Sequence, residues 1–354
     1  MSTVTFIIGN GFDLGIGLKT SYKNFLDVYK EPKKDDSEIV KWFKTEILEP
    51  DSANWENWAD FEWQMGQESS KFTGKNCVTD FNECIHNFTI AFNAYLCEIC
   101  ESIRWDGDLF YKCFDSFLSS IHHFERYIKS SDGMQIEELI GEQVNINFLQ
   151  FNYTSVFDEL LNITKNYMDF EYVRTFSYGH NIHIHGKIDE YITIGVDNVE
   201  QIVNEKIRKN PIARNFLVKT ENIATVQAED ANQIDYRKLA IEIIAESTVI
   251  CVFGSSIGET DKSWWVAIGE WLKTATGKLI IFDISGANKR KVSTLYLIEN
   301  KIILDGRKKS ILEKFANVSD LGMDWVKNNP DRIIIELDTE MFKFHVVPQV
   351  VNMM

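Results

Sequence analysis

The chain has 354 residues, 44% of them hydrophobic, and its acidic residues outnumber its basic ones to leave a formal net charge of −16. This length can bury a sizeable core as one domain with an insertion or as two packed lobes, and five prolines argue against long disordered linkers. The negative charge argues against broad nucleic-acid binding, and the lack of a signal peptide or of an apolar stretch near ~20 residues argues against membrane insertion, so we expect a cytoplasmic protein.

The first part of the chain begins with a strand and continues into helices. Residues 3–8 show the alternation and the β-branched side chains that are typical of a strand. The glycine-rich turn after them leads into a helix that begins near residue 21. From residue 36 to residue 130, apolar side chains recur at helical spacing and no strand is evident. This pattern predicts a helical insertion.

The predicted insertion divides the chain into two domains. We assign residues 1–35 and 140–354 to an α/β domain and residues 36–139 to a helical subdomain. Aromatic residues are frequent in the subdomain and include Trp42, Trp55, Trp58 and Trp63. Such a cluster is typical of a helical core. The alternative is a lid or an oligomerisation surface, from which Asp60 and Glu62 could reach the functional site.

After residue 140, predicted strands alternate with predicted helices. We expect strands at 144–151, 171–176, 183–185, 192–194, 248–253 and 278–282, and helices at 155–166, 235–245 and 261–274. This alternation indicates βαβ units, so we predict an α/β fold with a Rossmann-like, mostly parallel sheet flanked by helices. Ligands of such sheets bind outside the carboxyl ends of the strands.

The turn after the first strand is Gly9-Asn10-Gly11-Phe12-Asp13. Glycines can adopt backbone angles closed to other residues, so this turn can present N–H groups as a nest for an anion, and a helix N-terminus behind it would add positive charge. These features suit the diphosphate of a dinucleotide. A tight strand-to-helix turn that holds no ligand is the alternative.

Two polar motifs come next, Phe151-Asn152-Tyr153-Thr154 and His183-Ile184-His185-Gly186. Asn152 can donate and accept at once, which suits ribose hydroxyls or a reacting water, although Asn is also common at helix caps and turns. His185 precedes a glycine, and an imidazole can take a proton from water or a sugar hydroxyl near neutral pH. A hydrogen-bonded core histidine is the alternative for His185 and the favoured interpretation for His183.

The chain offers little sign of a metal site. His183 and His185 share a parity and could bind a metal, but no third ligand is evident, so we expect no metal. Cys97 and Cys100 form a lone C-x-x-C with no second pair at zinc spacing. The six cysteines are interpreted mainly as reduced core thiols.

The later strands are also followed by polar residues. Gly254-Ser255-Ser256 supplies small side chains and hydroxyls that suit a phosphate or a ribose, whereas a serine-rich turn with Asp261 as a helix cap explains the same residues without a ligand. Asp283 ends a predicted strand, where it could accept from adenosine ribose hydroxyls or serve as a turn residue. Because all these motifs fall at one edge of the sheet, we predict a single nucleotide site.

The order of these motifs resembles the sirtuin-like superfamily: G-x-G-x-D, F-N-Y-T, H-x-H-G, F-G-S-S-I-G-x-x-D and a strand that ends in Asp. The opening Ile-Ile-Gly-Asn-Gly-Phe-Asp-Leu of residues 7–14, with Gly-Leu-Lys-Thr-Ser-Tyr at 17–22, looks closely like the bacterial abortive-infection AbiH family of phage-defence proteins. The resemblance spans residue 4 to about residue 285. It implies a Rossmann-like sheet that binds NAD.

The resemblance also implies roles for single residues. Gly9 and Gly11 would face the phosphates of NAD, with the other residues of their motif around them. Asn152 would contact the nicotinamide ribose and a water molecule, and His185 would be the catalytic base. The zinc module of sirtuin deacylases, with its four cysteines, is missing, and so is an acyl-lysine channel, which favours NAD hydrolysis over deacylation.

At the other end of the dinucleotide, Gly254 and Ser255 would contact the phosphate and adenosine ribose region, with Ser256 beside them and Asp283 near the adenosine. The expected reaction cleaves the bond to nicotinamide through an oxocarbenium-like transition state, with His185 activating water and Asn152 holding the geometry. A nucleotide-binding sensor without turnover and another nucleotide-processing enzyme, such as a nuclease or a nucleotide transferase, are the alternatives.

The expected partners follow from this interpretation. They are NAD or a related nucleotide, a second copy of the chain, and an activator that is either phage-derived or a partner protein. No membrane partner is expected.

Overall fold

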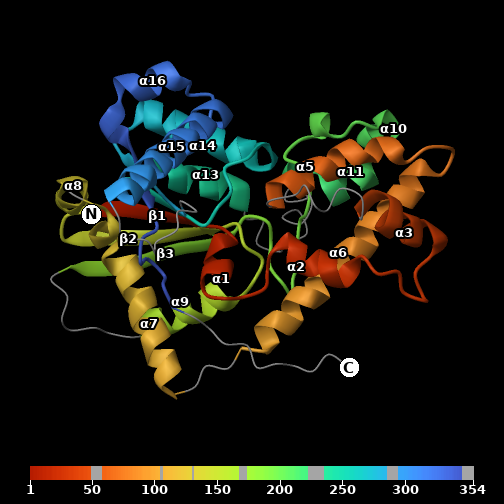
Figure 1. Ribbon diagram of the computed structural model, residues 1–354, viewed down its shortest axis with the longest axis horizontal. Coiled ribbons are helices and arrows are strands. Elements are labelled where there is room, and N and C mark those ends of the chain that lie inside the picture. Colours follow the sequence, from red (N-terminus) through yellow and green to blue (C-terminus); the bar gives the residue numbers. More distant parts are fainter. Residues whose placement is uncertain are drawn as a thin grey trace.

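The computed structural model describes residues 1–48, 58–103, 107–129, 131–166, 174–221, 235–284 and 294–344. These ranges form a six-stranded sheet with helices on both faces and, beside it, a further group of helices (Figure 1). The predicted α/β class with a Rossmann-like parallel sheet is confirmed.

Six strands form the sheet in the order β3-β2-β1-β4-β5-β6. They are β1 (Ser2–Ile8), β2 (Gln143–Gln150), β3 (Thr175–His183), β4 (Val249–Phe253), β5 (Lys278–Asp283) and β6 (Ile333–Leu337). All neighbouring strands pair in parallel. This is the strand order of the doubly wound dinucleotide-binding folds, and it reverses between β1 and β4. A ligand crevice is therefore expected where these two strands end.

Helices cover both faces of the sheet, and its two central strands, β1 and β4, are mostly apolar and almost entirely buried. In β4 the run Val-Ile-Cys-Val is buried, as are the last five residues of β1. Such continuous apolar runs are typical of parallel strands that are covered on both sides. One face packs against α7 (Gly107–His122), α8 (Ser131–Ile140) and α9 (Val156–Asn166), and the other against α13 (Tyr236–Glu246), α14 (Lys262–Thr274), α15 (Thr294–Val318) and α16 (Met323–Asn328).

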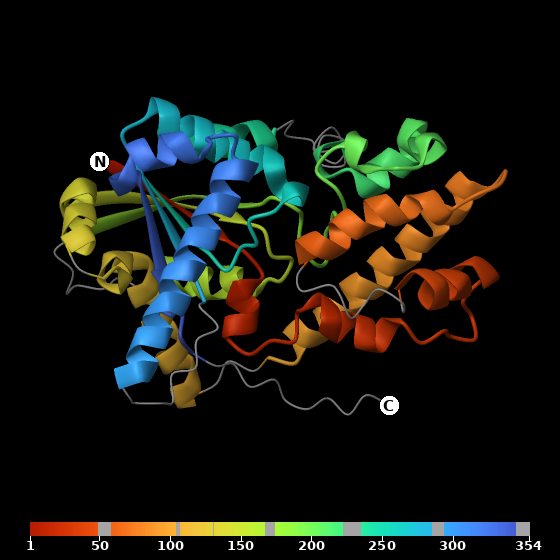
Figure 2. The ribbon, with the colours of Figure 1, turned by 45° about the horizontal axis from the view of Figure 1, so that its top comes forward.

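A further group of helices forms what we call the helical lobe, drawn in red, orange and green beside the sheet in Figure 2. It consists of α2 (Tyr22–Tyr29), α3 (Glu38–Trp42), α5 (Trp58–Glu68), α6 (Cys77–Glu101), α10 (Glu205–Lys209) and α11 (Pro211–Leu217), with a π-helical segment, Phe43–Leu48, after α3. Its core is aromatic: the Phe88 ring lies 5.1 Å from the rings of both Phe25 and Phe61. Tyr153 and residues 188–196 join this core and tie the lobe to the edge of the sheet.

Several predicted elements are confirmed within one or two residues at each end. These are the strands predicted at 3–8, 144–151, 248–253 and 278–282, and the helices predicted at 155–166, 235–245 and 261–274. The strands have long apolar or β-branched runs and the helices have amphipathic ones, which explains why the sequence pattern sufficed.

Other predicted strands are wrong. The chain forms β3 at Thr175–His183, whereas the sequence predicted separate strands at 171–176 and 183–185, of which residues 171–173 lie outside the described ranges. An edge strand with polar residues such as Asn181 gives no apolar run. The strand predicted at 192–194 is reduced to an isolated bridge between Gly186 and Ile192, and β6 was not predicted at all.

The hydrophobic clusters do not follow the predicted domain boundaries at residues 36 and 139. Side chains of α7 and α8 share a cluster with the sheet, while α2 belongs to the cluster of the helical lobe. The division into domains itself stays a prediction. Of the tryptophans named above, Trp42 packs on Phe72 and Trp63 is exposed. Trp55 and the side chain of Trp58 lie outside the described part, as does the side chain of Asp60.

None of the helices in the described ranges combines the length with the apolar composition that a membrane crossing requires.

Candidate functional site

The loops that follow β1 and β4 meet at the point where the strand order reverses. The Gly9 N–H donates to the carbonyl oxygen of Phe253 at 2.9 Å, and the Gly11 N–H donates to that of Gly254 at 2.7 Å. These two bonds continue the pairing of β1 with β4 beyond the strands. They hold together the floor of the crevice that the fold predicts there.

Glycine is required at this crossing because the two backbones touch. A Cβ atom on Gly9 would lie 2.5 Å from the Gly254 carbonyl oxygen, and one on Gly11 would lie 2.4 Å from the Gly254 Cα. Gly254 itself has φ +66°, and its Cβ would lie 2.6 Å from the Phe12 nitrogen. The close packing of the two loops therefore explains why these three positions are glycine. The left-handed backbone at Gly254 makes this packing possible.

Three N–H groups of this turn, which we expected to face a diphosphate, are engaged in hydrogen bonds within the protein. The amides of Gly9 and Gly11 donate to the β4 loop, and the amide of Phe12 donates to the Gly9 carbonyl at 2.9 Å. An anion in the crevice cannot use the Gly9 and Gly11 donors without breaking the crossing. Its recognition therefore falls to side chains and to the other backbone groups of the pocket.

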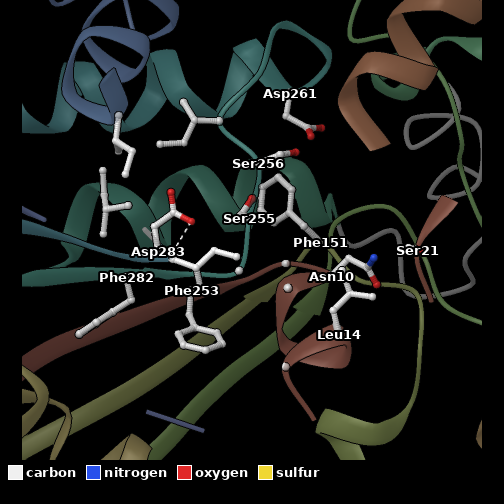
Figure 3. A pocket seen from close by; sticks show the side chains of 18 of the residues that line it. Asn10, Leu14, Ser21, Phe151, Phe253, Ser255, Ser256, Asp261, Phe282 and Asp283 are labelled. Atoms are coloured by element: carbon white, nitrogen blue, oxygen red, sulfur yellow. Dashed lines mark hydrogen bonds between the residues drawn. The ribbon is translucent and has the colours of Figure 1, made fainter. Parts of the chain in front are cut away.

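A pocket of about 1020 Å³ lies above the crossing (Figure 3). This volume is at the upper end of the range for ligand pockets, roughly 300–1,000 Å³. The predicted site residues that line it are Gly9, Asn10, Gly11, His185, Gly254, Ser255, Ser256 and Asp283. Figure 3 shows Asp261 and Asp283 on opposite sides of the pocket, with Ser255 and Ser256 between them.

Three predicted site residues do not line the pocket, namely Phe12, Asp13 and Asn152. The Phe12 ring points into the hydrophobic core, where it makes edge contacts with Phe157 and Phe342 at 5.2 and 5.3 Å. Neighbouring positions in a short helical turn face different sides, so sharing a motif with Gly9 and Gly11 did not bring Phe12 to the ligand side.

Asp13 and Asn152 belong to a buried polar layer and are both fully buried. The Thr154 hydroxyl lies 3.0 and 2.9 Å from the two carboxylate oxygens of Asp13, and the Asn152 amide donates to that hydroxyl at 3.5 Å. Burial raises the pKa of Asp13 to about 7, although hydrogen bonds from Thr154 and Asn152 favour the charged form. Asn152 Oδ1 has no hydrogen-bond partner among the described residues.

His183 is a hydrogen-bonded histidine outside the pocket lining. Its Nε2 lies 2.9 Å from Oδ2 of Asp158, and its Nδ1 lies 3.4 Å from the Asn152 carbonyl oxygen. Burial alone would raise the pKa of Asp158, but His183 outweighs it and lowers that pKa. This geometry agrees with the interpretation of His183 as a structural residue.

His185, by contrast, faces the pocket from the segment after β3. Its side chain is 3% exposed, and its ring meets that of Phe151 edge-on at 5.1 Å. Nε2 lies 2.9 Å from Oδ1 of Asp261, at ion-pair distance but poorly aligned for a hydrogen bond. Among the described side chains, no group of three or more His, Cys, Asp and Glu is arranged to hold a metal ion.

Asp261 also belongs to a buried ion network with two residues of, or next to, the helical lobe. Lys219, which follows α11, places Nζ 2.8 Å from Glu62 Oε2 and 3.0 Å from Asp261 Oδ1. All three side chains are less than a tenth exposed, and all three line the pocket. We call this set the Glu62–Lys219–Asp261 network.

The network shifts the pKa values of its three members in different directions. Burial disfavours a charged Asp261, but Lys219 and then His185 outweigh it and hold the pKa of that carboxyl well below its ordinary range. Burial raises the pKa of Glu62, and Lys219 only partly offsets it. Burial lowers the pKa of Lys219, but the two carboxylates reverse the effect and raise it. Lys219 and Asp261 are therefore charged at neutral pH.

Sequence reasoning missed most of this network. Asp261 was considered as a helix cap, but it makes no capping hydrogen bond to α14. Glu62 was named as able to reach the site, and it does, whereas nothing in the sequence around Lys219 distinguishes it from other lysines. Only the fold brings residues 62, 219 and 261 together.

The far side of the pocket carries basic groups that were also missed. Asp283 accepts from the Arg307 guanidinium at 2.6 Å and from the Ile284 amide at 2.7 Å, so its carboxylate is already engaged. Arg307 and Lys314, both on α15, line the pocket. Lys314, and Arg307 through donors other than the one that binds Asp283, offer an anionic ligand the positive charge that the engaged amides of Gly9 and Gly11 do not.

Comparison with known protein families matches residues 5–283 to the family described as Bacteriophage abortive infection AbiH. The matched segment runs from β1 to the end of β5 and so includes both crossing loops, His185 and Asp261. No curated protein matches the chain.

The loop crossing predicts a large loss of stability for Gly254→Ala. The new Cβ would collide with the Phe12 backbone in addition to the cost of a left-handed residue, which is about 1–2 kcal/mol. Gly141→Ala is the matched control, because Gly141 has φ +63° and open space around its Cβ. In urea unfolding we expect Gly254→Ala to lose at least about 2 kcal/mol more than the control. Equal losses would show that the loops do not touch.

The buried layer predicts that Asp13→Asn stabilises the protein at alkaline pH. In the folded protein the pKa of Asp13 is raised from 3.8 to about 7. The contribution of Asp13 to the free energy of unfolding is therefore fully present below pH 3.8 and is lost as the pH rises to about 7. The free energy of unfolding of Asp13→Asn relative to wild type should therefore increase by about 2–3 kcal/mol from pH 5 to pH 8. The exposed Asp331→Asn is the control, and a pH-independent difference for Asp13→Asn would contradict the burial argument.

Proposed function

The chain belongs to the bacteriophage abortive infection AbiH family, which gives it a role in phage abortive infection, and we propose that it fulfils this role as an NAD glycohydrolase. The enzyme would cleave the bond between nicotinamide and ribose and thereby remove NAD from the infected cell. The proposed NAD glycohydrolase activity is based on the pocket and on the residues that line it.

One observation carries the proposal: a buried imidazole, held at ion-pair distance from a carboxylate, faces a dinucleotide-sized pocket at the switch point of a Rossmann-like sheet. Doubly wound sheets with this strand order bind dinucleotides at that place. A protein that only binds a nucleotide has no need of a titratable group beside the reacting ribose. His185 therefore favours chemistry over simple binding.

The geometry suits an orientation of NAD along the pocket. The nicotinamide ribose would lie at the His185 side, and the adenosine would lie towards Asp283. The diphosphate would then pass Ser255 and Ser256, and Arg307 and Lys314 on α15 would balance its charge. This arrangement needs no nest of free amides in the glycine turn.

In the proposed reaction, His185 takes a proton from water, directly or through a ribose hydroxyl, as the oxygen of that water bonds to the anomeric carbon. The bond from that carbon to the pyridinium nitrogen breaks, and its electron pair leaves with nicotinamide, which becomes neutral. The products are nicotinamide and ADP-ribose, and the proton on His185 returns to solvent. No general acid is needed, because the leaving group is cationic in the substrate.

Asn152 has a supporting part in this proposal. It is fully buried, whereas its neighbours Phe151 and Tyr153 line the pocket. We therefore assign to Asn152 the task of holding these two neighbours in place, together with Thr154, in preference to the direct contact with ribose and water that the sequence suggested.

The direct test measures nicotinamide release from NAD by purified protein and NAD levels in cells under phage infection. We expect wild type to cleave NAD as purified protein, in infected cells, or in both. The rate should decrease by at least about 100-fold for His185→Gln, because a general base contributes that much or more. Binding of NAD by this variant, measured by calorimetry, should stay within a few-fold of wild type.

His180→Gln is the matched control, because His180 lies five residues earlier on β3, is exposed, and does not line the pocket. This variant should retain full turnover. Tight binding of NAD by wild type with no nicotinamide release in either setting would replace the hydrolase with a nucleotide sensor. Full turnover by His185→Gln would remove His185 as the base.

A further inference from the structure

We infer that Asp261 is the positioning residue of His185 and that Glu62 and Lys219 tune this pair from the helical lobe, so that the site is complete only when the lobe is docked on the sheet. The inference deepens the proposed function and rests on it for the identity of the reaction. It concerns the same pocket but residues to which no role has been assigned.

The four side chains form a continuous chain of contacts. Nε2 of His185 lies 2.9 Å from Oδ1 of Asp261, and the same carboxylate oxygen lies 3.0 Å from Nζ of Lys219. Lys219 in turn lies 2.8 Å from Glu62. The members come from four places in the fold: the segment after β3, the residue before α14, the segment after α11 and helix α5. Two of these places lie in or next to the helical lobe.

The contact of Asp261 with Nε2 decides which nitrogen of His185 can act. With Nε2 next to a carboxylate, the neutral ring is favoured in the tautomer that carries its proton on Nε2. Nδ1 is then the nitrogen that can take a proton. This is the base-and-orienting-group arrangement that activates histidine in other hydrolytic enzymes.

Lys219 sets how strongly Asp261 acts on the imidazole. A carboxylate that is fully paired with a lysine offers little charge to stabilise an imidazolium. Glu62 shares the lysine, so Asp261 keeps part of its negative charge for His185. The three side chains therefore act together, so that a change at Glu62, on the lobe, alters the base on the sheet.

A purely structural role explains the network less well. Buried ion pairs cost several kcal/mol of desolvation per ion and are weak contributors to stability. The helical lobe contains such a structural pair, in which Lys44 Nζ lies 2.8 Å from Asp36 Oδ2 with the two side chains 1% and 7% exposed. That pair does not line the pocket, whereas all members of the Glu62–Lys219–Asp261 network do.

The first test follows the titration of His185 by NMR with labelled histidine, which requires no turnover. The chain has seven histidines, and the signal of residue 185 is assigned by its loss in His185→Gln. Asp261→Asn removes the adjacent negative charge and should lower the midpoint of the His185 titration by about one pH unit or more. Glu62→Gln should lower it by less, because Lys219 then pairs with Asp261 alone.

Lys219→Met should shift the same midpoint upwards. The two carboxyl groups then adjoin each other, one of them takes a proton, and Asp261 no longer shares its charge with an ammonium. A network that only stabilises the fold would give no such opposed signs. The other groups that face His185 are Tyr153, whose ring centre lies 6.1 Å away, and Phe151, and all three variants leave them unchanged.

The matched control is Asp36→Asn, which breaks the buried pair with Lys44 in the same lobe. It should lower the unfolding temperature but leave the midpoint of the His185 titration and the rate of nicotinamide release unchanged. Equal midpoints for wild type, Asp261→Asn and Lys219→Met, in proteins that fold, would overturn the inference.

The second test uses turnover and so depends on the proposed function. The acid limb of the pH profile of nicotinamide release should move in the same directions as the NMR midpoints, and Asp261→Glu should recover part of the rate that Asp261→Asn loses. If wild type releases no nicotinamide while the NMR midpoints shift as expected, the hydrolase proposal fails and the assignment of Asp261 to His185 stands. If release is normal but the midpoints do not move, the assignment of Asp261 fails alone.

Discussion

The close approach of the loops after β1 and β4 is the constraint on which the rest of the structure depends. Gly9 and Gly11 press against Gly254 at distances that no Cβ could occupy, and the amide bonds between the loops extend the central strand pair. This crossing forms the floor of the pocket at the point where the strand order reverses. It also engages the amides of Gly9 and Gly11, so we expect a ligand to be recognised mainly by residues that other elements bring to the pocket.

Those residues come from both sides of the crossing. The segment after β3 carries His185 to the pocket, and its continuation at 188–196 is built into the aromatic core of the helical lobe. The lobe is thereby fixed next to the imidazole and places Glu62 beside Lys219. Asp261, at the start of α14, closes the contact from the side of the sheet. Burying these charges costs several kcal/mol per ion, and because they line the pocket we propose that they serve its function.

The fold and the outline of the site were predictable from the sequence, whereas the details were not. Buried parallel strands such as β4 have continuous apolar runs, so their positions and class followed from the pattern, but β3 is a polar edge strand and was misplaced. Local motifs located the loops correctly but not the direction of each side chain: Phe12 and Asn152 turn away from the pocket that their neighbours line. Lys219 has no local signal at all, because its partners are distant in sequence and only the folded chain assembles them.

We propose that the pocket above the loop crossing binds a dinucleotide with its reacting ribose at His185. A crystal structure of His185→Gln soaked with NAD tests this claim most directly, because the variant should bind the substrate without consuming it. We expect electron density for NAD across the pocket, with the nicotinamide ribose beside residue 185 and the adenosine towards Asp283. Density for the dinucleotide at another place, or an orientation that puts the adenosine at residue 185, would contradict it.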